Sequence, residues 1–433
     1  MELTPLCVYL AIVFGADEIA GLRQRNQEEL ASLREPKWFG SQTKSKIQSS
    51  PKRQRREAEW DDFLQKDILG KYITNYETVE QWLEQLAAGT PHLIQLIRIQ
   101  NVTFEGRQFT IAKLGQHADN VVKPVIWIDA GIHPREKLTQ PTAIYLIYRL
   151  LDDYYSGTNK DLLEDIDWYI LPNINPDGFA VTNDRSQGAQ GALWRKNVAA
   201  YPSYNNTGAE DNPGTRTAEP CRGVDLNRNF PEHWGYVPDH RVHHCAGTFA
   251  GPYAASENET RTLMRVLEDM GDVLSAYVAM HTFSQIVTGS WAFITDERPR
   301  NAAEMDRVGK KIAAAISDAH GRDYRYGLPP DIQYPYSGNA ADWVTSALNV
   351  TFSYTLELRD KDSFPNGRGH MIPEGDIIDV GEETHAGMVV LAREVLAKWN
   401  GETADAAQRA DARSLNNFLA FVFVCFMQRA LCK

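Results

Sequence analysis

A short turn with two metal-binding side chains follows one of the most apolar stretches of the chain. Residues 124–130 read Pro-Val-Ile-Trp-Ile-Asp-Ala, which has the length and β-branched content of a buried strand. Residues 131–136 read Gly-Ile-His-Pro-Arg-Glu, and the glycine and proline stop the strand. A catalytic zinc is held by three protein ligands and a water. His133 and Glu136 are two ligands of the right kind, so a third must come from elsewhere in the chain.

Strand-like and helix-like segments alternate along the rest of the chain. Strands are expected over residues 93–113 with a turn at Glu105-Gly106, and over residues 167–172, 273–280 and 350–358. Helices are expected from Thr74, with Thr78 as the cap, and over residues 142–153, 257–270, 298–320 and 384–399. This order predicts an α/β fold class: a single globular domain with a mixed, mostly parallel central sheet that is covered by helices on both faces.

The ends of two of these strands carry further reactive side chains. His281 directly follows the strand expected over residues 273–280, and Glu357 lies near the end of the one over residues 350–358. In parallel α/β sheets, ligands bind at the carboxyl ends of the strands. We therefore expect these side chains to gather with His133 on one edge of the sheet. A His-Glu-His set with one short and one long spacing is the ligand layout of a catalytic zinc.

Composition limits the partners of the chain. It has 433 residues, of which 43% are hydrophobic, and this is enough for one large core. Its formal net charge is -12. This charge argues against nucleic acid, or an anionic membrane surface, as the main partner.

The N-terminal part has the pattern of an exported protein. Residues 1–15 are expected to be a signal peptide with a short apolar core, although Glu2 stands where a basic residue is usual, which leaves a buried N-terminal helix as the alternative. Residues 16–61 form a short polar leader that ends near Arg53-Gln-Arg-Arg56. This motif is either a processing site at Arg56 or a solvated run of charge. The catalytic domain is expected over residues 62–400.

Cysteines and glycosylation sequons fit an extracellular chain. Of the five cysteines, only Cys221 and Cys245 lie in the body, and one disulfide is the simplest state of such a pair in a secreted protein. Asn-x-Ser/Thr sequons occur at Asn101, Asn205, Asn258 and Asn349. Asn205 lies in a polar stretch that could carry a glycan, whereas Asn349 lies against a strand expected to be buried.

The tail over residues 401–433 contains a short hydrophobic segment, residues 414–427. The segment is too short for a comfortable membrane-spanning helix. Two interpretations are open: it is a lipid-anchor signal that tethers the protein to a membrane, or an incidental apolar tail that packs on the body or is clipped. The polar end over residues 428–433 counts against a tether.

The chain resembles the zinc carboxypeptidases of the A/B type from about Asp67 to Trp399. The phrases that carry the resemblance are Gly-Ile-His133-Pro-Arg-Glu136, Asn175-Pro-Asp-Gly178, Leu193-Trp-Arg195-Lys196, Val224-Asp-Leu-Asn227-Arg228-Asn-Phe230, His281-Thr-Phe-Ser-Gln285, Ser337-Gly-Asn-Ala-Ala-Asp342-Trp343 and Glu357-Leu-Arg-Asp360. Each phrase alone is weak, but all of them in order at compatible spacing are very specific.

The resemblance implies a role for each group of residues. His133, Glu136 and His281 would hold one Zn²⁺ per chain. Glu357 would act as the general base, and Arg195 would stabilise the oxyanion of the tetrahedral intermediate.

The resemblance further implies a substrate-binding set made of Arg135, Asn227, Arg228, Tyr334 and Ala341. Asn227, Arg228 and Tyr334 would grip the free carboxylate of a substrate, since the guanidinium fork matches a carboxylate, while Arg135 would assist along the cleft. The Cys221–Cys245 disulfide of the family would bracket this loop.

Two further interpretations come from the alignment. Asp225 either orients His133 from behind or caps a turn. The floor of the side-chain pocket falls on Ala341, flanked by Thr288, Ala292, Tyr336, Asn339, Ala340 and Thr355. No charged residue is present in this set, so neutral aliphatic or aromatic C-terminal residues are expected, and Tyr336 could shift the preference toward smaller ones.

The sequence thus predicts a secreted, monomeric zinc metallocarboxypeptidase that hydrolyses the C-terminal bond of peptides and proteins. Two alternatives are a catalytically silent, peptide-binding relative and a zinc hydrolase of small acyl-amino acids. Glu357 argues against the first alternative, and the carboxylate-binding set argues for peptides over smaller substrates.

Overall fold

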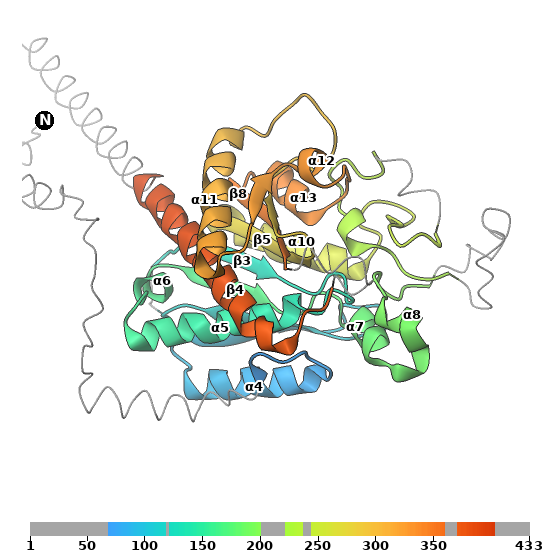
Figure 1. Ribbon diagram of the computed structural model, residues 1–433, viewed down its shortest axis with the longest axis horizontal. Helices are drawn as coiled ribbons and strands as arrows, with labels where there is room; N and C mark the ends of the chain where they lie inside the picture. The colour runs from blue at the N-terminus through green and yellow to red at the C-terminus, as the bar shows by residue number, and fades with distance from the viewer. Residues whose placement is uncertain (1–67, 118–120, 201–220, 237–243, 360–369, 403–433) are drawn as a thin grey trace, which may run out of the picture. The chain divides into compact units, whose positions relative to one another are not determined.

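An eight-stranded sheet lies at the centre of the computed structural model, which describes residues 68–402 except 118–120, 201–220, 237–243 and 360–369 (Figure 1). The strands are β1 (Ile94–Ile99), β2 (Phe109–Leu114), β3 (Val125–Asp129), β4 (Asp167–Leu171), β5 (Leu274–Thr282), β6 (Ile286–Thr288), β7 (Arg325–Gly327) and β8 (Phe352–Leu358). Their order across the sheet is β1-β2-β4-β3-β5-β8-β6-β7. The central pairs β4–β3, β3–β5 and β5–β8 are parallel, as is β6–β7, while the other pairs are antiparallel. The predicted mixed α/β sheet is confirmed.

Helices cover both faces of the sheet. They are α4 (Tyr76–Gly89), α5 (Thr139–Ser156), α6 (Asp161–Glu164), α7 (Pro176–Asn183), α8 (Gly188–Ala192), α10 (Asn258–Met270), α11 (Ala302–His320), α12 (Pro329–Ile332), α13 (Ala340–Ala347) and a last helix over residues 377–402. Core residues of α4, α5, α11 and the last helix pack on one face, and those of α10 and α13 pack on the other.

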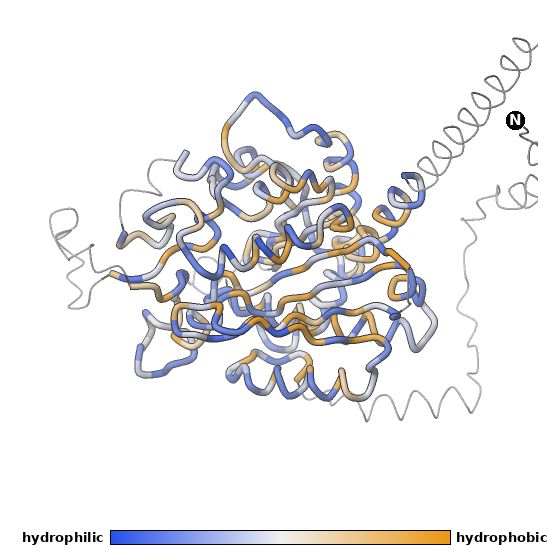
Figure 2. The backbone as a smooth tube through the Cα atoms, turned by 180° about the vertical axis from the view of Figure 1, so that it is seen from behind, coloured by the Kyte–Doolittle hydropathy of each residue, from blue (hydrophilic) through white to orange (hydrophobic). Residues whose placement is uncertain are grey.

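Alternation along β3 explains why both faces are apolar. Ile126 and Ile128 enter the first core, whereas Val125 and Trp127 enter the second. A strand buried on both sides must be apolar at successive positions. Figure 2 shows the result as hydrophobic colour along strands in the middle of the molecule.

The parallel pairing of β5 with β8 fixes the position of the candidate site. The register places His281 opposite Glu357. Because β3 is also parallel to β5, the turn that follows β3 comes to the same edge. The sheet thus brings the expected ligands and the expected base together.

Several element boundaries differ from those predicted. The side chain of Asn75, not Thr78, caps α4 by accepting a hydrogen bond from the amide of Glu77 at 2.9 Å. Strand β5 continues to Thr282, so His281 lies within the strand. Helix α11 begins at Ala302 rather than at residue 298. The sequence did not indicate β6, β7 or α13, because such short elements depend on their neighbours for burial.

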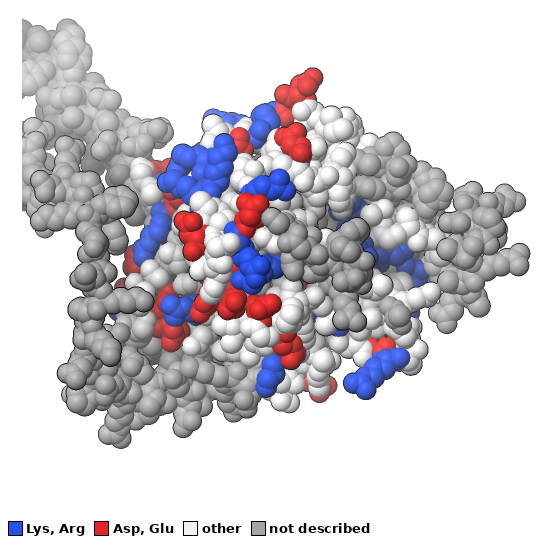
Figure 3. All heavy atoms as spheres, in the orientation of Figure 1, with Lys and Arg blue, Asp and Glu red and all other residues white. Residues whose placement is uncertain are grey.

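Charged side chains of both signs lie next to each other on the face seen in Figure 3. On this side of the sheet, Arg307 and Lys311 of α11 pair with Glu394 of the last helix at 2.8 and 2.6 Å. Among the residues that the structure describes, no helix is long and apolar enough to cross a membrane. The predicted signal peptide, the leader with Arg56 and the hydrophobic tail segment lie outside the described residues.

Candidate active site

The turn after β3 holds His133 and Glu136 on one side of a tight loop. The amide of Glu136 donates to the carbonyl of His133 at 3.0 Å, and the Thr139 hydroxyl donates to the carbonyl of Glu136 at 2.8 Å. Gly131 begins the turn with φ +72°, and a Cβ there would come within 2.9 Å of the Gln140 side chain. The glycine therefore meets both a conformational and a steric requirement.

Three side chains converge at this point. Nδ1 of His133 lies 2.8 Å from Oε1 of Glu136, and Nδ1 of His281 lies 3.0 Å from Oε2. The two Nδ1 atoms are 3.2 Å apart, and all three side chains are buried. Two imidazole nitrogens and a carboxylate directed at one point are the donor set of a catalytic zinc. The residues present therefore fit the metal.

Asp225 performs both of the roles that the sequence left open. Its Oδ1 lies 3.0 Å from Nε2 of His133 and also accepts from the amide of Asn227 at 3.0 Å. Its Oδ2 accepts from Nε of Arg195 at 2.9 Å. Asp225 thus caps the short 3-10 helix Leu226–Arg228 and fixes both the histidine and the arginine.

Burial and charge set the protonation states of this group. Burial, together with the charge of Arg195, lowers the pKa of His133, which favours the neutral form that binds metals. Burial would raise the pKa of Asp225, but the charge of Arg195 and the hydrogen bond from His133 hold it well below its usual value. Asp225 is therefore an anion, and Nε2 of His133 carries the proton that it donates to Oδ1.

Glu357 has one carboxylate oxygen without a partner. Oε1 accepts a hydrogen bond from the side-chain amide of Gln333 at 3.2 Å, whereas Oε2 is buried and has no partner among the described residues. Burial raises the pKa of Glu357 to about 7. A carboxyl group that titrates near neutral pH is suited to both accept and return a proton.

Arg228 is a buried cation that forms no ion pair with any of the described residues, although its charge helps to lower the pKa of Asp225. Its side chain is 2% exposed, and no described Asp or Glu forms an ion pair with it. Its guanidinium donates to the carbonyl of Asn227 at 2.8 Å and to the Tyr334 hydroxyl at 3.4 Å. The Nε atom of Arg228 has no hydrogen-bond partner among the residues that the structure describes. A guanidinium in this state is a ready site for a carboxylate.

The backbone around Arg228 is fixed. Gly338 has φ +73°, and a Cβ there would come within 2.2 Å of the Arg228 carbonyl oxygen. The amide of Asn227 is capped by Asp225, and its side-chain oxygen accepts from the amide of Ala340 at 3.1 Å. Asn227 Nδ2 lies 3.3 Å from Nε2 of His281. This loop therefore joins the carboxylate site to the metal cluster.

A cavity of about 270 Å³ connects these groups. Its lining residues are His133, Arg135, Glu136, Arg195, Asn227, Arg228, His281, Thr282, Phe283, Ser284, Gln333, Tyr334, Tyr336, Thr355, Glu357 and His370. Every expected catalytic, metal and carboxylate-binding residue is among them. Ala341 is not, and it lies in the second core at 6% exposure.

Sequence reasoning missed Gln333 and His370. Gln333 bonds to Glu357, and Nδ1 of His370 lies 3.2 Å from the Thr282 hydroxyl. Burial lowers the pKa of His370 to about 4, so this imidazole is neutral at the wall of the cavity. The only sequence signal for Gln333 was its place beside Tyr334, and no local pattern pointed to His370.

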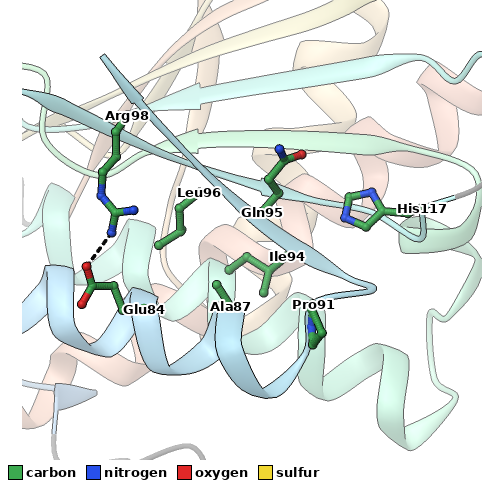
Figure 4. A pocket seen from close by; sticks show the side chains of 8 residues that line it. All are labelled: Glu84, Ala87, Pro91, Ile94, Gln95, Leu96, Arg98 and His117. Atoms are coloured by element: carbon green, nitrogen blue, oxygen red, sulfur yellow. Dashed lines mark hydrogen bonds and ion pairs between the residues drawn. The ribbon is translucent and has the colours of Figure 1, made fainter. Parts of the chain in front are cut away.

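A second hollow, of about 470 Å³, lies between α4 and the edge strand β1 (Figure 4). Its lining includes Glu84 and Arg98, which pair with each other at 2.8 Å. Apart from this ion pair, His117 is the only titratable residue in its lining. The smaller cavity therefore has the chemistry of an active site.

Comparison with known proteins agrees with this geometry. A sequence model of the zinc carboxypeptidases matches residues 79–387, which include the metal cluster and the whole cavity lining. The chain belongs to the zinc carboxypeptidase family. It is a zinc metallocarboxypeptidase, and therefore a hydrolase.

Relatives named carboxypeptidase A and carboxypeptidase B are both similar to this carboxypeptidase. It is 32% identical over 320 residues to carboxypeptidase B of Astacus astacus, covering 73% of this chain and 95% of the relative. It is 31% identical over 332 residues to zinc carboxypeptidase A 1 of Anopheles gambiae, covering 75% and 69%. Relatives named carboxypeptidase A and carboxypeptidase B match this chain equally well. The comparison therefore does not determine which C-terminal residue the enzyme prefers, and this depends on the residues that line its pocket.

Solved carboxypeptidase structures share the fold. Carboxypeptidase A of Helicoverpa armigera superposes with a TM-score of 0.64 at 28% identity, covering 79% of this chain and 81% of that one. Bovine thrombin-activatable fibrinolysis inhibitor, in complex with tick carboxypeptidase inhibitor, gives 0.63 at 26% identity, covering 76% and 99%. The expected disulfide between Cys221 and Cys245 is present and brackets the loop that contains Asn227 and Arg228.

Proposed function

We propose that this chain is a secreted carboxypeptidase that removes one uncharged residue from the C-terminus of peptides and proteins. The observation that carries the proposal is the cavity itself. It contains a His-Glu-His cluster, a base with a free oxygen at Glu357 and a buried guanidinium without an anion at Arg228. One cavity can thus bind a terminal carboxylate and hydrolyse the adjacent amide bond.

His133, Glu136 and His281 would hold one zinc ion per chain. When bound there, zinc supplies a Lewis acid and lowers the pKa of water to near about 7. Arg228 binds the terminal carboxylate, with Asn227 and Tyr334 beside it.

The remaining charged residues act on the bond that breaks. Glu357 accepts the proton of the attacking water at Oε2 and returns it to the leaving amine. The guanidinium of Arg195 stabilises the oxyanion, and Asp225 keeps it oriented for this task. Arg135 lies along the cavity and contacts the peptide on the side away from its terminus.

The walls beside Arg228 support a preference for uncharged terminal side chains. Tyr336 lies beside Arg228, Gln333 and Thr355 also line the cavity, and none of the three is charged. A charged terminal side chain would lose its hydration there without gaining a partner. The uncharged walls therefore support the prediction, made from the sequence, that neutral C-terminal residues are preferred. The largest terminal side chain that fits depends on Tyr336.

Extracellular location is supported by the disulfide, because such bonds persist in oxidising compartments. Asn101, Asn258 and Asn349 are exposed, so each is accessible to a glycan. Asn349 lies just before β8, with φ 53°, and is exposed although the strand that follows is buried as expected. We propose a monomer, since the metal cluster, the base and the carboxylate-binding groups are all supplied by a single chain and catalysis needs no second copy.

The two alternative functions make different predictions. A silent peptide-binding relative would not need a base, and the partnerless Oε2 of Glu357 argues against it. A hydrolase of small acyl-amino acids would use the same groups, so substrate length distinguishes the two enzymes.

The test is hydrolysis of blocked dipeptides, and of longer peptides with the same last residue, by the zinc-loaded full chain. We expect chelator-sensitive release of neutral residues from both, and no turnover by Glu357→Gln, which should keep its zinc. Release from acylated single amino acids alone would support the second alternative. No release by zinc-loaded protein would support the silent relative.

A further inference from the structure

The side chain of Tyr336 lies where the last side chain of a substrate would have to enter. The guanidinium carbon of Arg228 lies 4.4 Å from the centre of the Tyr336 ring. If Arg228 binds the terminal carboxylate, as the proposed function requires, the α-carbon is one bond away from that carboxylate. The side chain on the same carbon then lies near Arg228, where the Tyr336 ring covers one face of the guanidinium.

The ring is held firmly in this place. Tyr336 is only 4% exposed, and its amide donates to the carbonyl of Ala292 at 2.8 Å. The ring centre of Tyr334 is 5.6 Å away on one side. Beyond Tyr336, the amide of Phe230 donates to the Gly338 carbonyl at 2.9 Å. The backbone bonds fix the position of the Tyr336 backbone, and a swing of the ring out of the cavity would need the packing around it to change.

The small residues behind Tyr336 do not add depth to the cavity. Ala341, expected from the sequence to form the floor, is buried and does not line the cavity, whereas Tyr336 does. The whole cavity measures about 270 Å³, and this volume also includes the metal cluster and Glu357. Pockets for drug-sized ligands span roughly 300–1,000 Å³. A terminal side chain therefore shares this volume with the reacting groups, and the Tyr336 ring bounds it.

We propose that Tyr336 is a specificity-determining residue that restricts the last residue of the substrate to small, uncharged side chains such as those of alanine and serine. Leucine and phenylalanine need space that the ring occupies. Gln333 and Thr355 also line the cavity and are polar, which suits a small hydroxyl-bearing side chain as well as a methyl group. The inference rests on the proposed function, because it takes Arg228 as the carboxylate site.

The experiment compares kcat/KM of the zinc-loaded full chain for blocked dipeptides that end in Ala, Ser, Leu and Phe. We expect the native protein to favour Ala over Phe by at least about 10-fold, a ratio within reach of steric discrimination in a pocket. Tyr336→Ala should raise kcat/KM for Phe at least about 10-fold and reverse the order. Tyr336→Phe keeps the ring and should keep the preference for Ala. Tyr253→Ala, a matched change of an exposed tyrosine, should leave the ratio as it is in the native protein.

Two results would overturn the inference while leaving the proposed function intact: native protein that hydrolyses the Phe substrate faster than the Ala substrate, or an unchanged ratio in Tyr336→Ala of normal zinc content. Failure to hydrolyse any of the dipeptides would overturn both. If Tyr336→Ala does not fold, Tyr336→Val provides the same test. A binding measurement independent of turnover uses propionate and 3-phenylpropionate: only the enlarged pocket should bind the aromatic acid more tightly.

Discussion

The side-chain amide of Gln333 donates a hydrogen bond to Oε1 of Glu357 at 3.2 Å, and this leaves Oε2 as the free oxygen of the base. Gln333 follows directly after α12, whose sequence begins with two prolines, and its own amide donates to the carbonyl of Pro329 at 2.9 Å. A short, stiff turn therefore holds the donor in place. Gln333 acts on the reaction through Glu357, as a positioning residue.

Gln333→Met should lower kcat by about 3- to 10-fold, the effect of losing roughly one hydrogen bond to the base. KM should change little, because Arg228 remains to bind the carboxylate. The hydrogen bond lowers the pKa of Glu357, so the acid limb of the pH–rate profile should move to higher pH in the variant. Gln187→Met is the matched control, since Gln187 also donates to a carboxylate at 3.2 Å, but outside the cavity. Native kcat and an unmoved acid limb in Gln333→Met would refute the role.

Asp225→Asn should weaken zinc binding by roughly 10- to 100-fold, as expected when the partner of a liganding histidine is lost. Competition with chelators of graded affinity measures this change. Asp184→Asn is the control for the loss of a helix cap. Asp184 caps the 3-10 helix Arg185–Gln187 in the same way, but it contacts no metal ligand. Equal zinc affinity in the two variants would show that Asp225 is only a cap.

Arg228→Ala should raise KM for substrates with a free carboxylate by about 10- to 150-fold, since hydrogen bonds to charged groups contribute about 1.5–3 kcal/mol. The preference for the free acid over its amide should fall by a similar factor. Arg222→Ala is the control, because Arg222 also lies over an aromatic ring, that of Trp194 at 5.5 Å. An unchanged KM in Arg228→Ala would place the carboxylate site elsewhere.

The raised pKa of Glu259 predicts that stability falls as the pH rises from about 4.5 to about 8. Burial, with the nearby charges of Glu257 and Asp177, raises its pKa from 4.5 to about 8. The folded state then binds more protons than the unfolded state between these values, so the contribution of Glu259 is complete below about pH 4.5 and is lost as the pH rises through about 8. Thermal unfolding should show that Glu259→Gln gains Tm over the native protein at about pH 8 but not at about pH 5. Glu268→Gln, at an exposed position of the same helix, should show no such gain. Parallel Tm curves for native protein and Glu259→Gln would contradict the prediction.

Local patterns were enough for the core of the fold and for the metal turn. The run over residues 124–130 is apolar at successive positions because β3 is buried on both faces, and the glycine and proline that follow end it. His133 and Glu136 lie on one loop, so their spacing in the sequence already limits their spacing in space. The N-cap of α4 was predicted wrongly. Asn75 and Thr78 both have side chains that can cap a helix, and the residue at which the helix begins decides which of them does so.

Contacts between distant segments could not be predicted in this way. Asp225 and His133 are 92 positions apart, and the sequence alone could not decide whether Asp225 orients a histidine or caps a turn. The bond from Gln333 to Glu357 depends on the turn after α12 lying over the end of β8.

The sequence by itself determined the α/β fold class and the kinds of side chain that bind the metal, because strand burial and ligand chemistry are properties of the residues themselves. Only the tertiary structure decided that Tyr336, and not Ala341, lines the cavity. The physical reason is that the size of a pocket depends on which side chain fills the space, and packing between separate elements settles this.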